Sequence, residues 1–182
     1  MTSFIINSQV ERASKPQWSL SGSDCVFCRI KRNEIPAYKL YENDKVFAIL
    51  DIMPLRKGHA LVIPKEHYSR VSELPPEIAA AVGEAVSKVA GALVQATEHT
   101  ALNIVCNQEY AQAVPHVHYH IIPAPILNAS SSQSTQVQPT ASSTSISPPP
   151  SRRRMHQMEF ESRSELDDED ADMLVTKIKA RL

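Results

Sequence analysis

The sequence predicts an α+β domain, in which helices pack on an antiparallel sheet. Several short apolar segments with strand-like composition follow one another closely along the chain. One long segment, 75–96, instead repeats its apolar residues at helical spacing. A third segment, 116–122, alternates histidine with apolar residues, which is typical of a strand with two different faces.

The composition limits the kind of protein. A length of 182 residues suits one domain with appendages, and the net charge of −1 is unlike the basic face of a nucleic-acid-binding protein. Three cysteines are too few for a secreted disulfide scaffold, and no stretch is long enough to span a bilayer. We therefore expect a soluble protein of a reducing, intracellular environment, cytoplasmic or nuclear, without nucleic-acid or membrane partners. A mitochondrial destination stays open.

The N-terminal half begins with a leader and continues as closely spaced strands. Residues 1–22 are polar and unpatterned, so we expect a disordered leader before a domain that spans 23–123. Ser23-Asp24 can cap a short helix over 25–31. Three strands separated by turn residues are predicted next, at 39–42, 46–50 and 59–63.

The long helix is the clearest element of the second half. Pro75-Pro76 opens it, and it runs through Ala96 with apolar residues on one stripe: Ile78, Val82, Ala85, Val86, Val89 and Leu93. The domain should then finish with a strand, a loop and the histidine-bearing strand, at 102–106, 107–113 and 116–122.

The C-terminal part changes character twice. Residues 124–158 are mostly Ser, Thr, Gln, Pro and Ala at first and then carry three adjacent arginines, so we expect a disordered loop. We interpret the three arginines as part of a solvated linker. A nuclear signal and a phosphate contact are the alternatives. Within 159–182, Ser164 and Asp167 resemble a capping box. The helix that follows should dock on the domain through one apolar stripe: Ala171, Leu174, Val175 and Ile178.

Three of the seven histidines, His116, His118 and His120, occupy alternate positions of one predicted strand. With a rise of about 3.3 Å per residue, their rings would lie on one face at steps of about 6.6 Å. Val117, Tyr119 and Ile121 would point to the other face. A core does not favour a row of titratable rings, so we interpret this row as a functional site.

The sequence His-Val-His-Tyr-His-Ile-Ile resembles the signature of the histidine-triad (HIT) family of nucleotide hydrolases and transferases. The resemblance covers residues 24–123 almost without a gap, through segments at 25–36, 41–52 and 58–65. It is closest to the nucleotide-binding, phosphoramidase-like branch and its zinc-bearing fungal-type members. It implies a five-stranded antiparallel sheet with one long helix and a C-terminal helix, and a homodimer with a ten-stranded sheet.

The resemblance also implies an activity and its catalytic residues. The substrate would be a purine nucleotide or nucleoside phosphoramidate, cleaved at the α-phosphorus without a catalytic metal. His118 would be the nucleophile that forms a covalent nucleotidyl intermediate. His120 would contact the phosphate or the leaving group, and His59 would support the triad from the adjacent strand.

Other residues match nucleotide-binding positions of the family. Asp51 resembles the carboxylate that accepts both ribose hydroxyls, and a turn-forming role is its alternative. Asn107 and Gln112 match positions near the phosphate and the leaving group. The apolar residues around the base, which would otherwise be ordinary core residues, are Val26, Phe27, Ile30, Ile49 and Ile52.

The cysteine pair indicates a metal. Cys25 and Cys28 alone are a weak signal, because such a pair is also found redox-active or simply buried. His67 and His116 match the two further ligands of zinc-bearing relatives, so the resemblance implies a structural zinc site of four ligands. This site would fasten the N-terminal segment to the triad strand. An unmetallated pair is the alternative.

One departure from the family pattern keeps other functions open. Where related members often carry Gly-Gln-Ser before the triad, this chain has Ala111-Gln112-Ala113. The serine hydroxyl that would bind or protonate the leaving group is therefore missing at Ala113. A dinucleoside polyphosphate hydrolase is one alternative, and a low-turnover nucleotide-binding scaffold that acts through partners is another.

Overall fold

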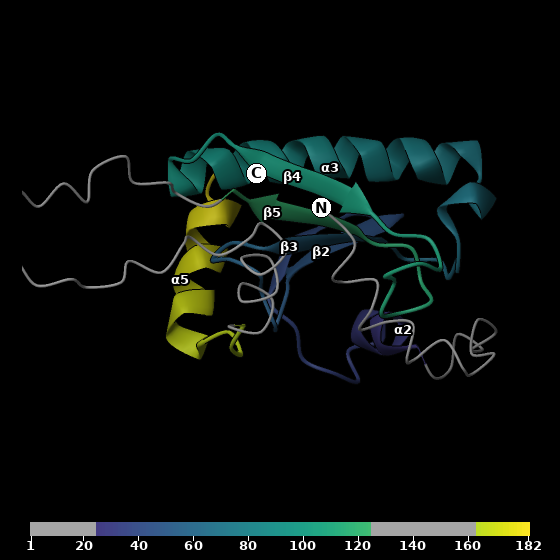
Figure 1. Cartoon of the computed structure of the whole chain (residues 1–182), viewed down its shortest axis with the longest axis horizontal. Coiled ribbons are helices and arrows are strands. Elements are labelled where there is room, and N and C mark those ends of the chain that lie inside the picture. Colours follow the sequence, from purple (N-terminus) through teal and green to yellow (C-terminus); the bar gives the residue numbers. More distant parts are fainter. Residues whose placement is uncertain (1–24, 125–162) are drawn as a thin grey trace, which may run out of the picture.

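The computed structural model describes residues 25–124 and 163–182 (Figure 1). The predicted leader, the Ser23-Asp24 cap and nearly all of the predicted loop 124–158 lie outside these residues. The elements, in chain order, are α2 (Val26–Lys31), β1 (Lys39–Glu42), β2 (Val46–Leu50), β3 (Ala60–Pro64), η1 (Val71–Glu73), α3 (Pro76–Thr97), β4 (Leu102–Cys106), β5 (Tyr119–Pro123) and α5 (Asp168–Lys179).

The five strands form one antiparallel sheet with the order β1-β2-β3-β5-β4. Asn43 makes the turn between β1 and β2, since its side-chain oxygen accepts hydrogen bonds from Lys45 N and Val46 N at 2.9 and 2.7 Å. β3 and β5 are far apart in sequence, and their pairing sets Leu61 opposite His120. The predicted five-stranded antiparallel sheet is therefore confirmed. The predicted homodimer concerns a second chain and stays a prediction.

The sheet is covered on both faces, with α3 along one side and α2 on the other (Figure 1). Alternate residues of β2 show this division. Ala48 and Leu50 pack in the cluster under α3 and α5, whereas Phe47 and Ile49 pack with α2. All five residues of β2 and all five of β3 are buried. These two strands form the buried centre of the sheet, and β5 with its histidine pairs with β3.

The predicted strand over 116–122 is wrong in its first three residues, because β5 begins at Tyr119. The ladder with β3 ends at the pair Val62 and Tyr119. Upstream of it, Val117 N donates instead to Tyr68 O at 2.7 Å. β3 ends at Pro64, which has no N–H to extend the ladder. The segment before Tyr119 is therefore free to place His116 away from the other two triad histidines.

The helix α5 packs against α3 and β1 through its buried residues Ala171, Leu174 and Ile178. Its N-cap is Asp167, whose side chain accepts from Glu169 N and Asp170 N at 3.0 and 3.2 Å. The predicted capping box at Ser164 is therefore wrong, since Asp167 acts as the cap and not as the third helical residue. Among the described helices, none combines the length and apolar character that crossing a bilayer requires.

Candidate active site and metal centre

The pairing of β3 with β5 brings together the three histidines that were predicted to be catalytic. His59 lies directly before β3, His118 directly before β5, and His120 within β5. Their rings are close, with centroids 5.1 Å apart for His59 and His120 and 4.8 Å apart for His118 and His120. His59 and His118 are buried, and His120 is partly buried. Three imidazoles thus line one small region of the sheet.

A backbone hydrogen bond determines the tautomer of His118. Its Nδ1 lies 2.7 Å from the carbonyl oxygen of His116, and a carbonyl oxygen only accepts. Nδ1 therefore carries the hydrogen, and Nε2 of the neutral ring keeps its lone pair. Burial lowers the pKa of His118, which favours this neutral form near pH 7. A neutral imidazole with a free Nε2 can act as a nucleophile.

His59 lies between Asp51 and His120. Its Nε2 lies 2.9 Å from His120 Nδ1, and its Nδ1 lies 3.3 Å from Asp51 Oδ2 and 3.2 Å from Leu55 N. Burial lowers the pKa of His59 to about 4, although the charge of Asp51 opposes this shift, so the ring is neutral near pH 7. The contact with Asp51 is therefore not an ion pair at that pH.

The neutral ring of His59 then has a defined tautomer. Leu55 N–H can only donate to Nδ1, so the hydrogen of His59 sits on Nε2 and points to His120 Nδ1. His120 consequently carries its own hydrogen on Nε2, where it can be donated to a ligand. Burial lowers the pKa of His120 to about 2, so this ring is also neutral.

The contacts among Asp51, His59 and His120 are explained better by the hydrogen bonds of His59 than by a bound metal ion. The ligand atoms of Asp51, His59 and His120 all lie within 4.8 Å of one another. His59, however, faces its two neighbours with different ring nitrogens, and one ion cannot replace both contacts. We therefore interpret His59, which accepts from Leu55 N and donates to His120, as the residue that orients His120.

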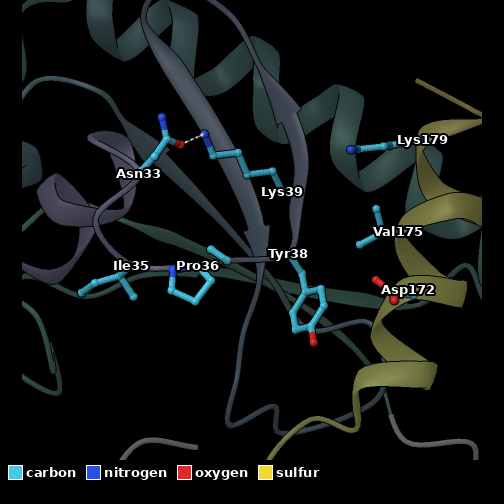
Figure 2. Close-up of a pocket in the computed structure, with 9 residues that line it drawn as sticks. Asn33, Ile35, Pro36, Tyr38, Lys39, Asp172, Val175 and Lys179 are labelled. Atoms are coloured by element: carbon cyan, nitrogen blue, oxygen red, sulfur yellow. Dashed lines mark hydrogen bonds between the residues drawn. The ribbon is translucent and has the colours of Figure 1, made fainter.

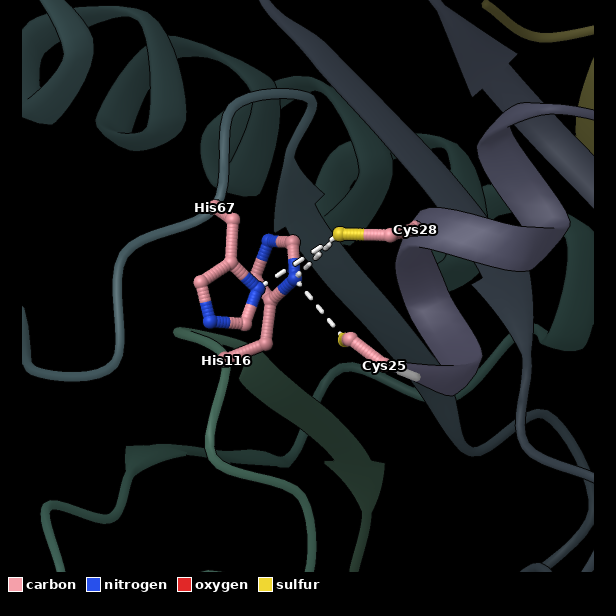
Figure 3. Close-up of side chains that lie close together, drawn as sticks. All are labelled: Cys25, Cys28, His67 and His116. Carbon is pink, nitrogen blue, oxygen red and sulfur yellow. Dashed lines mark hydrogen bonds between the residues drawn. The ribbon is translucent and has the colours of Figure 1, made fainter. Parts of the chain in front are cut away.

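The cysteine–histidine cluster consists of Cys25, Cys28, His67 and His116, which converge from α2, the segment after β3 and the segment before β5 (Figure 3). The sulfur of Cys25 lies 3.3 Å from His116 Nδ1, and the sulfur of Cys28 lies 3.7 Å from the same atom and 3.5 Å from His67 Nδ1. Ligands of one tetrahedral zinc ion, with bonds of about 2.3 Å to sulfur and about 2.0 Å to nitrogen, are about 3.5 Å apart. The spacing fits zinc.

The surroundings of the cluster also fit a metal. His116 Nε2 donates to Pro64 O at 2.9 Å, which leaves the lone pair of Nδ1 facing both sulfurs. Burial, with the nearby Cys25, raises the pKa of Cys28 to about 11, so a bound cation would be needed to keep the Cys28 sulfur as a thiolate near pH 7. His67 Nδ1 is the ring nitrogen that faces the sulfur of Cys28, while its Nε2 is buried without a hydrogen-bond partner among the described residues.

Comparison with known proteins identifies the family. The sequence model of the HIT domain family matches residues 32–125 of this chain. The chain belongs to the HIT family. Among curated relatives, an adenosine 5′-monophosphoramidase of Schizosaccharomyces pombe is 45% identical over 102 residues, which are 56% of this chain and 74% of that protein. An adenylylsulfatase of Arabidopsis thaliana is 44% identical over 111 residues, 60% of this chain. The match spans only 56% of the plant protein's own length.

Solved HIT structures have the same fold. A zinc-bound histidine triad family protein from Mycobacterium smegmatis superimposes with a TM-score of 0.63 at 26% identity, over 88% of this chain and 96% of that chain. A HIT family member from Bacillus subtilis gives a TM-score of 0.53 at 43% identity, over 55% of this chain and 72% of that chain.

The predicted base-binding residues of the HIT domain fall into two groups. The ring of Phe27 lies edge-on to His118, with centroids 5.2 Å apart, and Ile30 and Ile49 are buried in the same cluster as Phe27. Val26 is partly buried against that cluster. Ile52 is 58% exposed in the connection after β2. An apolar surface thus adjoins His118, with Ile52 outside the packed core.

The loop before the triad is held by its own hydrogen bonds. Gln112 is buried, its side-chain oxygen accepts from Glu109 N at 2.8 Å, and its side-chain nitrogen donates to Ser69 O at 3.0 Å. Ala111 has a φ of 57°, a left-handed conformation that costs a residue with Cβ about 1–2 kcal/mol. A glycine at this position would avoid that cost. Asn107 is partly buried at the start of the same loop.

A cavity of about 440 Å³ lies elsewhere, between the segment before β1 and helix α5 (Figure 2). Its lining contains none of the predicted site residues: Asn33, Ile35, Pro36, Ala37, Tyr38, Lys39, Asp172, Val175 and Lys179. Because the groups capable of catalysis gather at the histidines, we place the candidate site there.

Proposed function

We propose that this protein is a hydrolase that cleaves purine nucleotides at the α-phosphorus, through a covalent intermediate on His118. The observation that carries the proposal is the 2.7 Å hydrogen bond from His118 Nδ1 to His116 O, which leaves Nε2 as the attacking atom. Relatives named adenosine 5′-monophosphoramidase and adenylylsulfatase support a nucleotide substrate. A nucleoside 5′-phosphoramidate is the substrate we favour.

The reaction has two steps. In the first, His118 Nε2 forms a bond to phosphorus, and the leaving group departs with the electrons of its bond and takes a proton from solvent. In the second, water attacks phosphorus, the bond to Nε2 breaks, and the nucleotide is released as a monophosphate. His120 Nε2–H donates a hydrogen bond to a phosphoryl oxygen, which stabilises the charge that develops in both steps. Neither step requires a metal.

The nucleotide itself is held by the residues around the triad. Asp51 accepts hydrogen bonds from the ribose hydroxyls, and the apolar surface of Phe27 beside His118 receives the base. Asn107 contacts the phosphate. Because Gln112 accepts from Glu109 N in the loop and donates to Ser69 O in the segment after β3, we assign Gln112 a positioning role for that loop.

The cysteine–histidine cluster would hold a structural zinc ion. Zinc there supplies cross-links between segments far apart in the sequence. His116 is the link to catalysis, because its ring faces the cluster while its carbonyl oxygen accepts from His118 Nδ1. A bound ion would therefore fix the residue that sets the tautomer of the nucleophile.

The experiment that tests this function is single-turnover hydrolysis of adenosine 5′-phosphoramidate, with mass spectrometry of the quenched protein. We expect a protein-bound AMP adduct in the wild type and loss of adduct and turnover in His118→Ala. His99→Ala is the matched control, since His99 lies away from the triad and bonds to Ala124 O. The same assay with a diadenosine polyphosphate tests the alternative leaving group.

A low-turnover nucleotide-binding scaffold is the second candidate, favoured by one observation. Ala113 offers no hydroxyl to the leaving group, and Gln112 is engaged elsewhere. If wild type and His118→Ala bind AMP equally and show the same negligible rate without an adduct, the hydrolase proposal is wrong and the scaffold is the better account.

A further inference from the structure

The peptide unit between Ile52 and Met53 makes hydrogen bonds to two different parts of the chain. Its carbonyl oxygen, on Ile52, accepts from Leu166 N at 2.9 Å. Its N–H, on Met53, donates to Asp51 Oδ1 at 2.9 Å. The C=O and N–H of a trans peptide point to opposite sides of one rigid plane. Leu166 and the carboxylate of Asp51 are therefore linked through a single peptide plane, and a rotation of that plane weakens both bonds.

Hydrogen bonds, more than packing, hold the connection that contains this peptide. The side chains of Ile52 and Met53 are 58% and 40% exposed, so packing fixes them little. Asp51 N donates to His59 O at 2.9 Å, which joins the two ends of the connection. Asp51 Oδ2 lies 3.3 Å from His59 Nδ1, but this nitrogen accepts from Leu55 N and has no hydrogen to donate. The bond from Met53 N thus orients the carboxylate where the ring of His59 does not.

The donor, Leu166, is held in place by the docking of α5. It directly precedes Asp167, the N-cap of that helix, and its side chain is partly buried against the cluster under α3 and α5. Lys57 Nζ lies 2.6 Å from Asp170 Oδ1, which adds a second contact between α5 and the connection. Leu166 lies beyond residue 125, where the matched HIT domain ends. A segment outside that domain thus supplies a hydrogen bond to the connection that follows Asp51.

We propose that Leu166 is a positioning residue of the nucleotide site. Its backbone N–H fixes the peptide between Ile52 and Met53, and this peptide orients Asp51 for the two ribose hydroxyls. The inference rests on the proposed function, in which Asp51 accepts from the ribose. It makes the segment before α5 part of the discrimination between ribonucleotides and nucleotides that lack these hydroxyls. Leu166 acts through the peptide and Asp51, not on the reacting phosphorus.

The first test removes the donor from the full-length protein. Leu166→Pro has no N–H at this position, and Leu166→Ala is the matched control, because it also loses the leucine side chain but keeps the N–H. We expect the Met53 N–H to exchange with solvent about fivefold faster in Leu166→Pro than in Leu166→Ala, as the loss of one hydrogen bond predicts. Amide hydrogen exchange followed by NMR measures this difference without any substrate. Equal exchange in the two variants overturns the inference.

The second test compares two substrates, adenosine 5′-phosphoramidate and its 2′,3′-dideoxy analogue. Relative to Leu166→Ala, KM of Leu166→Pro for the ribonucleotide should rise about fivefold, with kcat changed by less than about twofold and KM for the dideoxy analogue unchanged. The ratio of the two KM values compares substrates on the same folded molecules. Lys57→Ala, which breaks the other contact with α5, should leave this ratio at the wild-type value. An unchanged ribonucleotide KM in Leu166→Pro, or an equal rise for both substrates, contradicts the inference.

A third test uses the wild type alone and does not depend on the folding of Leu166→Pro. Coupling between two sites is reciprocal, so a ribose bound to Asp51 must also strengthen the bond of the Leu166 N–H. Saturating AMP should slow exchange of this N–H about fivefold relative to saturating 2′,3′-dideoxy-AMP, and equal exchange would refute the coupling. Failure of the wild type to bind AMP or to cleave the phosphoramidate would overturn the proposed function instead, while the exchange difference between the two Leu166 variants would stand.

Discussion

Replacing Gly58 by alanine should destabilise the protein and disturb the backbone turn that precedes His59. Gly58 has a φ of +88°, which residues with a Cβ rarely adopt. A Cβ at this position would lie 3.0 Å from Leu93 Cδ1 and 3.5 Å from Pro123 Cγ. Leu93 is fully buried in the core under α3, so its side chain has little room to move away.

The size of the effect follows from these two causes. The left-handed backbone costs alanine about 1–2 kcal/mol, and crowding in a packed core costs about 1–3 kcal/mol. Alanine also restricts the unfolded chain, which offsets about 0.4–1 kcal/mol. We expect a net loss of about 1–4 kcal/mol. With a urea m-value of about 1–3 kcal/mol per molar, a loss from the middle of this range should lower the unfolding midpoint by about 1 M.

Urea unfolding followed by circular dichroism measures this loss. The matched controls are Gly83→Ala and Gly91→Ala, exposed positions of α3 where an added Cβ meets nothing within 4 Å. Each control should raise the free energy of unfolding by about 0.5–1 kcal/mol, because alanine favours the helix over glycine. If Gly58→Ala proves as stable as these helix variants, the argument from φ and close packing is refuted.

Two further predictions concern the metal and the pH dependence of stability. Cys28→Ser should lower the zinc content of the purified protein, measured by atomic absorption, well below one ion per chain and lower Tm; full zinc retention would speak against the cluster. In the folded protein, burial lowers the pKa values of His59 and His120 from 6.5 to about 4 and about 2. As the pH drops, both rings therefore bind protons in the unfolded chain before they do so in the folded protein. Stability should thus be complete above pH 6.5 and decline from there toward pH 4, by up to about 1.4 kcal/mol per pH unit for each ring. His120→Gln should make this decline shallower, and an unchanged slope in urea titrations across this range would contradict it.

The sequence alone determined the order and type of the elements, because strand alternation and helical spacing are local properties. Four of the five strands and the long helix were predicted within one residue of their observed bounds, whereas the histidine-bearing strand was predicted to begin three residues too early. The row of three histidines was visible as a site.

Only the tertiary structure decided which distant groups meet. His116 leaves the strand because its neighbours bond to the segment after β3, and Asp167 takes the cap because the backbone begins its helix there. The orientation of His120 by His59 depends on the hydrogen bond that Leu55 N–H donates to His59, which no residue pattern reveals. Leu166 reaches Ile52 from more than a hundred residues away, through the hydrogen bond from its backbone N–H to the carbonyl oxygen of Ile52. Local sequence carries no signal for such contacts, since they follow from how whole elements pack.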